Sequence, residues 1–226
     1  MKTRITKAHR LASGLTTMAI AIGLFNVAQF ALGGPQPTPG NSSAFGNSLT
    51  TWQETYFRWN YGDITVPTDS NGNAIVGNHT VLFPLPAAAG DGTPAHLDVT
   101  LSAGQSFVLP LWALLGTSYT DGTPPDPSVP DSVFQTLDIS FTIDGVTVVN
   151  GSNVLNYYSK ETFNPAIAIV GFPPVDSIIW MQSIGITHAP LTPGTHTFAL
   201  HAGNTQAVFG GFFSEYNNTW TVTVLP

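Results

Sequence analysis

The chain has 226 residues, of which 6 are Lys or Arg, 13 are Asp or Glu and none is Cys. The length suits a single domain. The absence of Cys excludes a disulfide scaffold, thiolate metal sites, a cysteine nucleophile and a lipid-modified N-terminal Cys. The excess of acidic residues argues against general nucleic-acid binding, because proteins of that class carry a basic surface.

The N-terminal segment has the charge pattern of a targeting sequence. Four of the six basic residues lie within the first ten positions: Lys2, Arg4, Lys7 and Arg10. An uncharged stretch, 11–32, follows, and Ala31-Leu32-Gly33 fits a small-x-small cleavage pattern. Residues 1–33 are therefore predicted to be a secretory signal peptide. The stretch is also long enough to span a bilayer, but polar residues interrupt it, which favours cleavage over a stable membrane anchor.

Removal of this leader changes the charge of the protein. The remaining 193 residues contain only two basic side chains, Arg58 and Lys160, against 13 acidic ones, for a formal net charge of −11. A negative field repels polyanions and can concentrate cations. We therefore expect an acidic protein that is secreted to the extracellular space or the periplasm and has no nucleic-acid partner.

Beyond the leader, the chain is predicted to hold one linker and one domain. Residues 34–46 are rich in Pro, Gly and Ser, a composition that favours an extended linker. Residues 47–226 contain no second linker and no internal repeat. They are predicted to form a single domain.

One helix is predicted, over 47–61. Asn47 or Ser48 can cap its start, and Glu54 and Arg58 are four residues apart in the favourable order for an ion pair. Three aromatic residues recur at i, i+4 and i+7, so they share one face: Trp52, Tyr56 and Trp59.

Much of the remaining sequence alternates with period two, as strands do. The clearest case is a set of apolar residues before a tight Asp144-Gly145 turn: Leu137, Ile139, Phe141 and Ile143. On the return strand we expect Ile143 to face Val146 and Phe141 to face Val148. A second apolar run, 107–112, contains Pro110, which cannot donate to a ladder and predicts a sheet edge or a bulge.

Short strands, frequent Pro and Gly turns and one early helix predict the fold class. We expect a mainly β protein, an antiparallel β-sandwich or jelly roll with one short N-terminal amphipathic helix.

Several segments also carry a resemblance to a family. They are the leader, the Trp52-x6-Trp59 helix, Gly104-Gln-Ser-Phe-Val-Leu-Pro110, the hairpin 141–148 and Pro190-Leu-Thr-Pro-Gly-Thr-His-Thr197. Together they resemble a family of uncharacterised secreted bacterial proteins with a predicted β-sandwich, over most of residues 50–226. The resemblance implies secretion and the fold class, and it carries over no catalytic residue.

The first candidate site lies at the end of the predicted helix. Trp59, Tyr61 and Asp63 combine flat aromatic faces with a carboxylate, which suits stacking on a sugar ring and acceptance of hydroxyl hydrogen bonds. The alternative is that the aromatic stripe is core, because a short helix must bury one face to be stable. Core is the more frequent outcome for aromatic residues at helical spacing.

The second candidate site is a loop with three carboxylates. Asp121, Asp126 and Asp131 lie in a stiff, Pro-rich segment and supply oxygen ligands of the kind that Ca²⁺ prefers. Their spacing matches no defined calcium loop, and Asp is a common turn residue. Ca²⁺ is the only cofactor that the sequence suggests.

No catalytic signature is present in the sequence. It contains no Gly-x-Ser-x-Gly elbow, no phosphate loop and no dinucleotide fingerprint. The leading hypothesis is a secreted, non-enzymatic β-sandwich with a binding or extracellular structural role and a glycan or protein partner. The alternative is a carbohydrate-active protein, either a sugar-binding module or a glycoside hydrolase.

Overall fold

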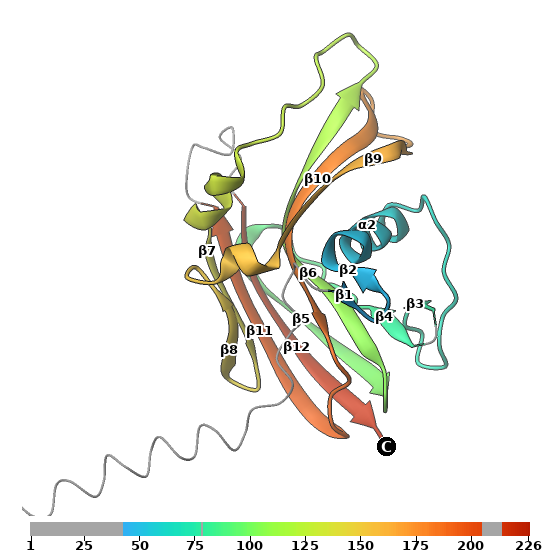
Figure 1. Cartoon of the computed structure of the whole chain (residues 1–226), viewed down its shortest axis with the longest axis vertical. Coiled ribbons are helices and arrows are strands. Elements are labelled where there is room, and N and C mark those ends of the chain that lie inside the picture. The colour runs from blue at the N-terminus through green and yellow to red at the C-terminus, as the bar shows by residue number, and fades with distance from the viewer. Residues whose placement is uncertain (1–42, 78, 205–213) are drawn as a thin grey trace, which may run out of the picture. The chain divides into compact units, whose positions relative to one another are not determined.

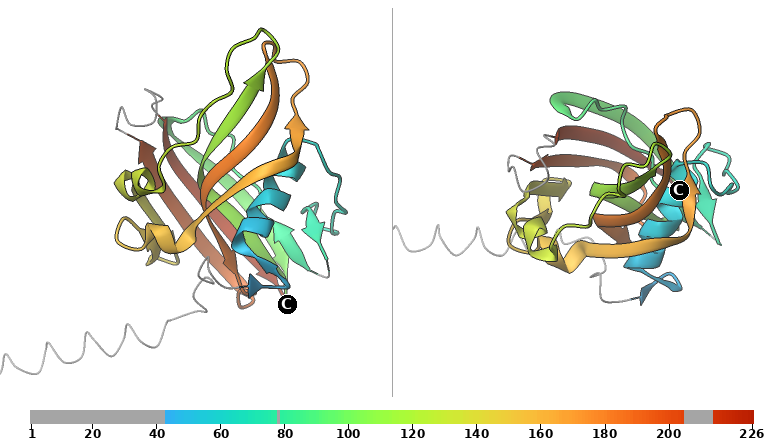
Figure 2. Two further views of the ribbon diagram at one scale, coloured as in Figure 1. Left: turned by 45° about the horizontal axis from the view of Figure 1, so that its top comes forward. Right: turned by 90° about the horizontal axis from the view of Figure 1, so that it is seen from above.

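The computed structural model describes residues 43–77, 79–204 and 214–226. The predicted signal peptide, 1–33, and residues 34–42 of the predicted linker lie outside the described residues. In the described part of the chain, two five-stranded sheets pack face to face, with one α-helix against the outside of the first sheet (Figure 1, Figure 2). This arrangement confirms the prediction of a mainly β sandwich with one N-terminal helix. Within the described part of the chain, no helix is long and apolar enough to cross a membrane.

The first sheet has the strand order β3-β4-β6-β10-β9. Its long strands β6, β10 and β9 curl away from the second sheet at one end, at the top of Figure 1. The pair β4–β6 is parallel and the other pairs are antiparallel. The bounds are β3 (Ile75–Val76), β4 (Thr80–Leu82), β6 (Ser106–Tyr119), β10 (Val175–His188) and β9 (Tyr158–Ala168).

The second sheet has the strand order β5-β12-β11-β7-β8. Here β5 runs parallel to β12, so the first and last long strands of the sandwich are neighbours. The two parallel pairs are departures from the antiparallel pairing that the sequence predicts. The bounds are β5 (Asp91–Ser102), β12 (Ser214–Leu225), β11 (Gly194–Asn204), β7 (Asp138–Ile143) and β8 (Val146–Asn150).

Aromatic rings fill the space between the sheets. The ring of Phe198, on β11, lies near the centre, with its centroid 5.4 Å from Phe83, 5.5 Å from Phe107 and 5.8 Å from Phe141. Trp220 completes the group, and its indole nitrogen donates to the Pro84 carbonyl at 2.9 Å. Large rings that meet at tilted angles bury much apolar area and gain specific contacts, so this cluster joins the two sheets.

The β7–β8 hairpin agrees with the sequence at its turn and differs beyond it. Asp144 and Gly145 both have positive φ angles, of 51° and 75°, as a type I′ turn requires. Ile143 faces Val146, as predicted. Phe141 faces Val149 instead of the predicted Val148, because a bulge shifts the register between Phe141 and Thr142.

The predicted helix is α2 (Leu49–Asn60), and its start is well defined. Ser48 is the N-cap, and its hydroxyl accepts the Thr51 amide at 3.1 Å. The preceding residues form a small hairpin of β1 (Ser43–Ala44) and β2 (Asn47–Ser48), so part of the predicted linker is paired chain. Trp52 and Tyr56 are buried, and their polar groups donate to the carbonyls of Ala44 and Phe83.

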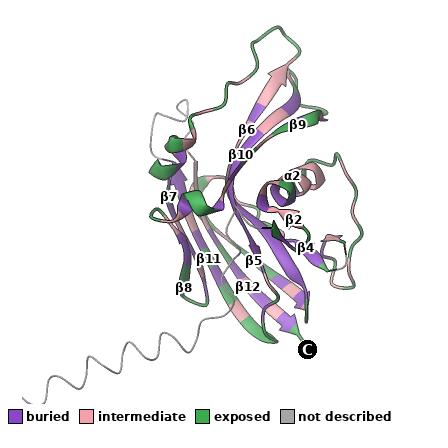
Figure 3. Ribbon diagram, in the orientation of Figure 1, coloured by how far each residue is buried: buried purple, intermediate pink, exposed green. Residues whose placement is uncertain are grey.

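The helix gives β6 and β10 a second buried face (Figure 3). Val108 packs under Trp52 and Tyr56, while Phe107 and Leu109 point into the sandwich. This explains the continuous apolar run 107–112, since a strand covered on both sides has no solvent face. Pro110 lies opposite Gly185, where the register shifts, so the prediction of a bulge is confirmed in a central strand.

One polar side chain of the helix is buried against this sheet. Gln53 is fully buried, and both its amide nitrogen and its amide oxygen lack a hydrogen-bond partner among the described residues. The side chain lies against Gly185, where an added Cβ would come within 2.1 Å of it. A buried polar group without a partner costs about 1–3 kcal/mol.

Replacing Gln53 with an apolar residue of similar shape is expected to stabilise the protein. Gln53→Met should raise the free energy of unfolding by about 1–3 kcal/mol, because it removes the unpaired amide without adding a branch. Chemical denaturation followed by tryptophan fluorescence measures the change. Gln53→Glu is the matched variant, and it should lower the free energy of unfolding because it buries a charge. A loss of stability in Gln53→Met would contradict this account.

His196 is bonded in a way that favours its charged form. Its Nδ1 lies 2.7 Å from a carboxylate oxygen of Asp144, and its Nε2 lies 2.8 Å from the Thr192 carbonyl. Both partners are acceptors, so both ring nitrogens must donate, which requires the imidazolium. Although burial lowers the pKa of His196, its bonds to Asp144 and to the Thr192 carbonyl raise the pKa overall.

This pair predicts a pH dependence of stability. A raised pKa in the folded state adds stability below the ordinary histidine pKa of about 6.5, and that stability is lost as pH rises through the folded pKa. Between about pH 6 and 8 the free energy of unfolding should fall by up to about 1 kcal/mol on account of this pair. Asp144→Asn should remove that part of the fall, as urea denaturation at several pH values would measure.

Asp144→Asn is a conservative variant. Asn tolerates the left-handed backbone of the turn, and its carbonyl can still accept the Thr197 amide that Asp144 accepts at 2.8 Å. The pKa of His201 is also raised, through its hydrogen bond with Asn217 and despite burial. His201 is the same in both proteins, so the difference between the stability–pH profiles of wild type and Asp144→Asn tests the His196–Asp144 pair. Identical profiles would contradict the contribution of this pair.

Candidate functional site

A pocket of about 360 Å³ lies on the face of β9 and β10 opposite the helix. The register pairs Lys160 with Gln182 and Thr162 with Trp180, so these four side chains share one sheet face. The Pro-rich loop, residues 121–131, forms the other wall through Ser128 and Asp131. The site therefore joins two strands to a loop that lies far from them in sequence.

Two partly buried attachments hold the Pro-rich loop over the sheet. The carboxylate of Asp126 accepts the Thr117 amide at 3.0 Å, the Thr117 hydroxyl at 2.6 Å and the Tyr119 hydroxyl at 2.9 Å. The amide of Gln182 pairs with both backbone groups of Val129, accepting at 2.9 Å and donating at 2.8 Å. These bonds tie the loop to β6 and β10 and fix one wall of the pocket.

Asp131 and Lys160 supply charge to the pocket. The Lys160 ammonium lies 2.8 Å from one carboxylate oxygen of Asp131, and the Tyr158 hydroxyl donates to the other at 2.8 Å. The bonds from Lys160 and Tyr158 lower the pKa of Asp131. Burial, opposed by the bond from Gln182 and assisted by Asp131, raises the pKa of Tyr158 to about 12. Asp131 thus lines the pocket as a carboxylate, and the Tyr158 phenol stays protonated beside the pocket and donates to that carboxylate.

Trp180 supplies the aromatic surface of the pocket. Its indole nitrogen donates to the Asp126 carbonyl at 2.8 Å, which fixes the ring beside the loop. The ring also lies against Gly116 of β6, where an added Cβ would come within 1.9 Å of it. Gly116 has an ordinary backbone angle, so what requires glycine here is the close approach of the ring.

The three carboxylates of the predicted calcium loop have separate partners. Asp121 accepts the Thr123 amide at 2.9 Å, Asp126 binds Thr117 and Tyr119, and Asp131 binds Tyr158 and Lys160. Among residues 43–77, 79–204 and 214–226, no group of three or more acidic or histidine side chains is placed to hold a metal ion. The structure therefore gives these aspartates the roles of a turn cap and of loop anchors.

The three residues predicted at the helix end lie in different surroundings. Trp59 is half-buried and packs edge-on against Tyr56, with ring centroids 5.4 Å apart. Tyr61 lines a second cavity, described below. Asp63 binds Arg58 at 2.6 Å. The structure does not group the three side chains around one described pocket.

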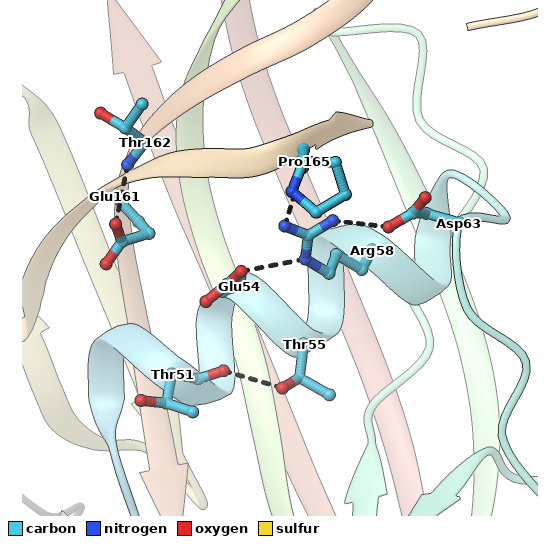
Figure 4. Close-up of polar contacts among 8 residues, drawn as sticks. All are labelled: Thr51, Glu54, Thr55, Arg58, Asp63, Glu161, Thr162 and Pro165. Atoms are coloured by element: carbon cyan, nitrogen blue, oxygen red, sulfur yellow. Dashed lines mark hydrogen bonds and ion pairs between the residues drawn. The ribbon is translucent and has the colours of Figure 1, made fainter. Parts of the chain in front are cut away.

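Arg58 gives Asp63 a structural partner (Figure 4). The guanidinium binds Glu54 at 2.9 Å, as the helical spacing predicts, and donates to the Pro165 carbonyl at 3.0 Å. It also lies over the ring of Phe163, 5.3 Å from the centroid. Burial lowers the pKa of Arg58, but the bonds to Asp63 and Glu54 raise it overall. The cluster fastens the helix end to β9.

Sequence reasoning missed Trp180, Gln182 and Thr162 as site residues. Two signals were present in the chain. Lys160 is one of only two basic residues after the predicted leader, and Gly116 comes directly after the apolar run 107–115. Neither signal identifies the residue that it contacts. Folding alone brings Gly116 to Trp180 and Lys160 to Asp131.

Comparison with protein families, with curated proteins and with solved structures finds no match to this chain. Evidence for a function of this protein therefore comes from the residues of the two cavities themselves.

Gly116→Ala is expected to disturb the pocket from beneath. The added methyl group must displace Trp180 or shift β6, so the free energy of unfolding should fall by about 1–3 kcal/mol. Gly151→Ala is the matched control, because its Cβ would meet no atom within 4 Å. Thermal denaturation and near-ultraviolet circular dichroism measure stability and the setting of the indole. Equal stability and equal spectra for the two variants would contradict the contact.

Proposed function

We propose that the protein is a secreted, non-enzymatic β-sandwich that binds carbohydrate through the pocket of Trp180, Asp131 and Lys160. The observation that carries the proposal is an indole ring beside a carboxylate, an ammonium and the hydroxyl-bearing side chains of Ser128 and Thr162. An aromatic surface suits the apolar face of a sugar ring. Charged and hydroxyl groups can accept from and donate to its hydroxyl groups.

The size and rigidity of the pocket support binding of a short glycan segment. Its volume of about 360 Å³ lies at the lower end of the range of ligand sites, about 300–1,000 Å³. Its aromatic group is fixed by the Asp126 carbonyl, and its loop wall is fixed by Gln182. Groups that are held before the ligand arrives lose less entropy on binding.

The chemistry of the pocket favours binding over hydrolysis. A glycoside hydrolase needs two carboxyl groups flanking the scissile bond, one of them protonated. The Asp131 carboxyl is kept ionised by Lys160 and Tyr158. Glu161 also borders the pocket, but strand alternation directs it to the opposite sheet face from Lys160, and it accepts the Thr162 amide at 3.0 Å.

A glycan array followed by calorimetry with the best oligosaccharide tests the proposal. We expect saturable binding by the wild type and roughly two- to tenfold weaker binding by Trp180→Ala, which removes the stacking surface. Trp180→Phe should keep more of the affinity than Trp180→Ala, because it keeps an aromatic ring although it loses the pyrrole part of the indole and the hydrogen bond to the Asp126 carbonyl. Circular dichroism checks that each variant is folded.

Trp59→Ala is the matched control, since Trp59 is also half-buried but borders neither of the two described cavities. Its affinity should equal that of the wild type. Loss of binding in Trp59→Ala with binding retained in Trp180→Ala would contradict binding at the Trp180 pocket and favour a carbohydrate site at the helix end. No binding to any glycan would refute the proposal, and turnover of a glycan that Glu161→Gln abolishes would favour the hydrolase alternative.

A further inference from the structure

A second cavity, of about 280 Å³, lies where the end of α2 meets β6 and β12. Its walls include Phe57 and Tyr61 from the helix end, Trp112 from β6, Tyr216 from β12 and Leu85 from the segment between β4 and β5. Tyr61 and Leu85 are each 41% exposed, so they form an apolar rim that opens to solvent. Exposed apolar side chains around a concave site are a feature of ligand pockets.

The lining of this cavity is uncharged. Among the described residues that border it, none is Asp, Glu, Lys, Arg or His. Burial and the neighbouring Tyr216 raise the pKa of Tyr61, which keeps its hydroxyl protonated at neutral pH. An ionised ligand would therefore find no partner of opposite charge here, and burying it would be costly.

One polar group in the lining has an unmet hydrogen bond. Asn218 of β12 is only 5% exposed, and its Oδ1 is buried without a hydrogen-bond partner among the described residues. Its cross-strand neighbour, Leu200, also lines the cavity, so the amide lies in an apolar wall. A buried carbonyl oxygen of this kind is stabilised by a ligand that donates to it.

We infer that this cavity binds a small uncharged molecule with a ring-sized apolar body and one hydroxyl group, which donates to Oδ1 of Asn218. The aromatic walls accept the body by edge and face contacts, and the single unmet acceptor selects the hydroxyl group. This site is separate from the proposed carbohydrate pocket, with which it shares none of the lining residues that the structure describes.

Titration with 4-methylphenol and with toluene, followed by ligand-observed NMR, tests the inference on the purified protein. The two probes share an apolar ring with one methyl group, and only 4-methylphenol carries a hydroxyl. We expect 4-methylphenol to bind saturably and about tenfold more tightly than toluene, the difference that one buried hydrogen bond makes. Asn218→Leu should abolish this preference while leaving toluene binding intact.

Two further variants separate the cavity from other surfaces. Ala88→Phe should weaken binding of both probes, because Ala88 lines the cavity and the added ring fills it. Trp180→Ala should change neither affinity. The inference is overturned if 4-methylphenol does not bind saturably, if the two probes bind wild type equally, or if the preference persists in Asn218→Leu. The wild-type comparison decides by itself if Asn218→Leu does not fold.

Discussion

The fold depends on burial of the β6–β10 pair on both faces. On one face the pair meets the aromatic cluster between the sheets, and on the other it is covered by α2 through Trp52, Tyr56 and Phe57. The helix is short, so its stability comes from this packing more than from its own hydrogen bonds. Both cavities border this doubly covered pair, one under the Pro-rich loop and one beside the helix end.

Two glycines let large side chains approach these central strands closely. Gly116 of β6 leaves room for the Trp180 ring, and Gly185 of β10 leaves room for Gln53. At each point the backbone itself forms the contact surface, because glycine has no Cβ. The first contact sets the position of the aromatic group in the proposed carbohydrate pocket. The second accommodates a polar residue in the helix interface.

The two basic residues of the described chain each connect distant segments. Arg58 joins the helix end to β9, and Lys160 of β9 joins Asp131 at the start of the short helix η1 (Asp131–Thr136). In a domain with so few charges, the ion pairs of Arg58 and Lys160 occupy carboxylates that the sequence suggests as ligand-binding groups. Asp63 and Asp131 are both held in this way.

The sequence by itself determined the local features. The cap at Ser48, the Glu54–Arg58 pair and the Asp144-Gly145 turn depend on residues within a few positions of one another, and helix and strand periods fix which side chains share a face. Only the tertiary structure decided the sites. The wall around Trp180 and the unpaired Oδ1 of Asn218 arise from strand pairing and bulges. Long-range packing sets these features, so no short-range pattern in the sequence predicts them.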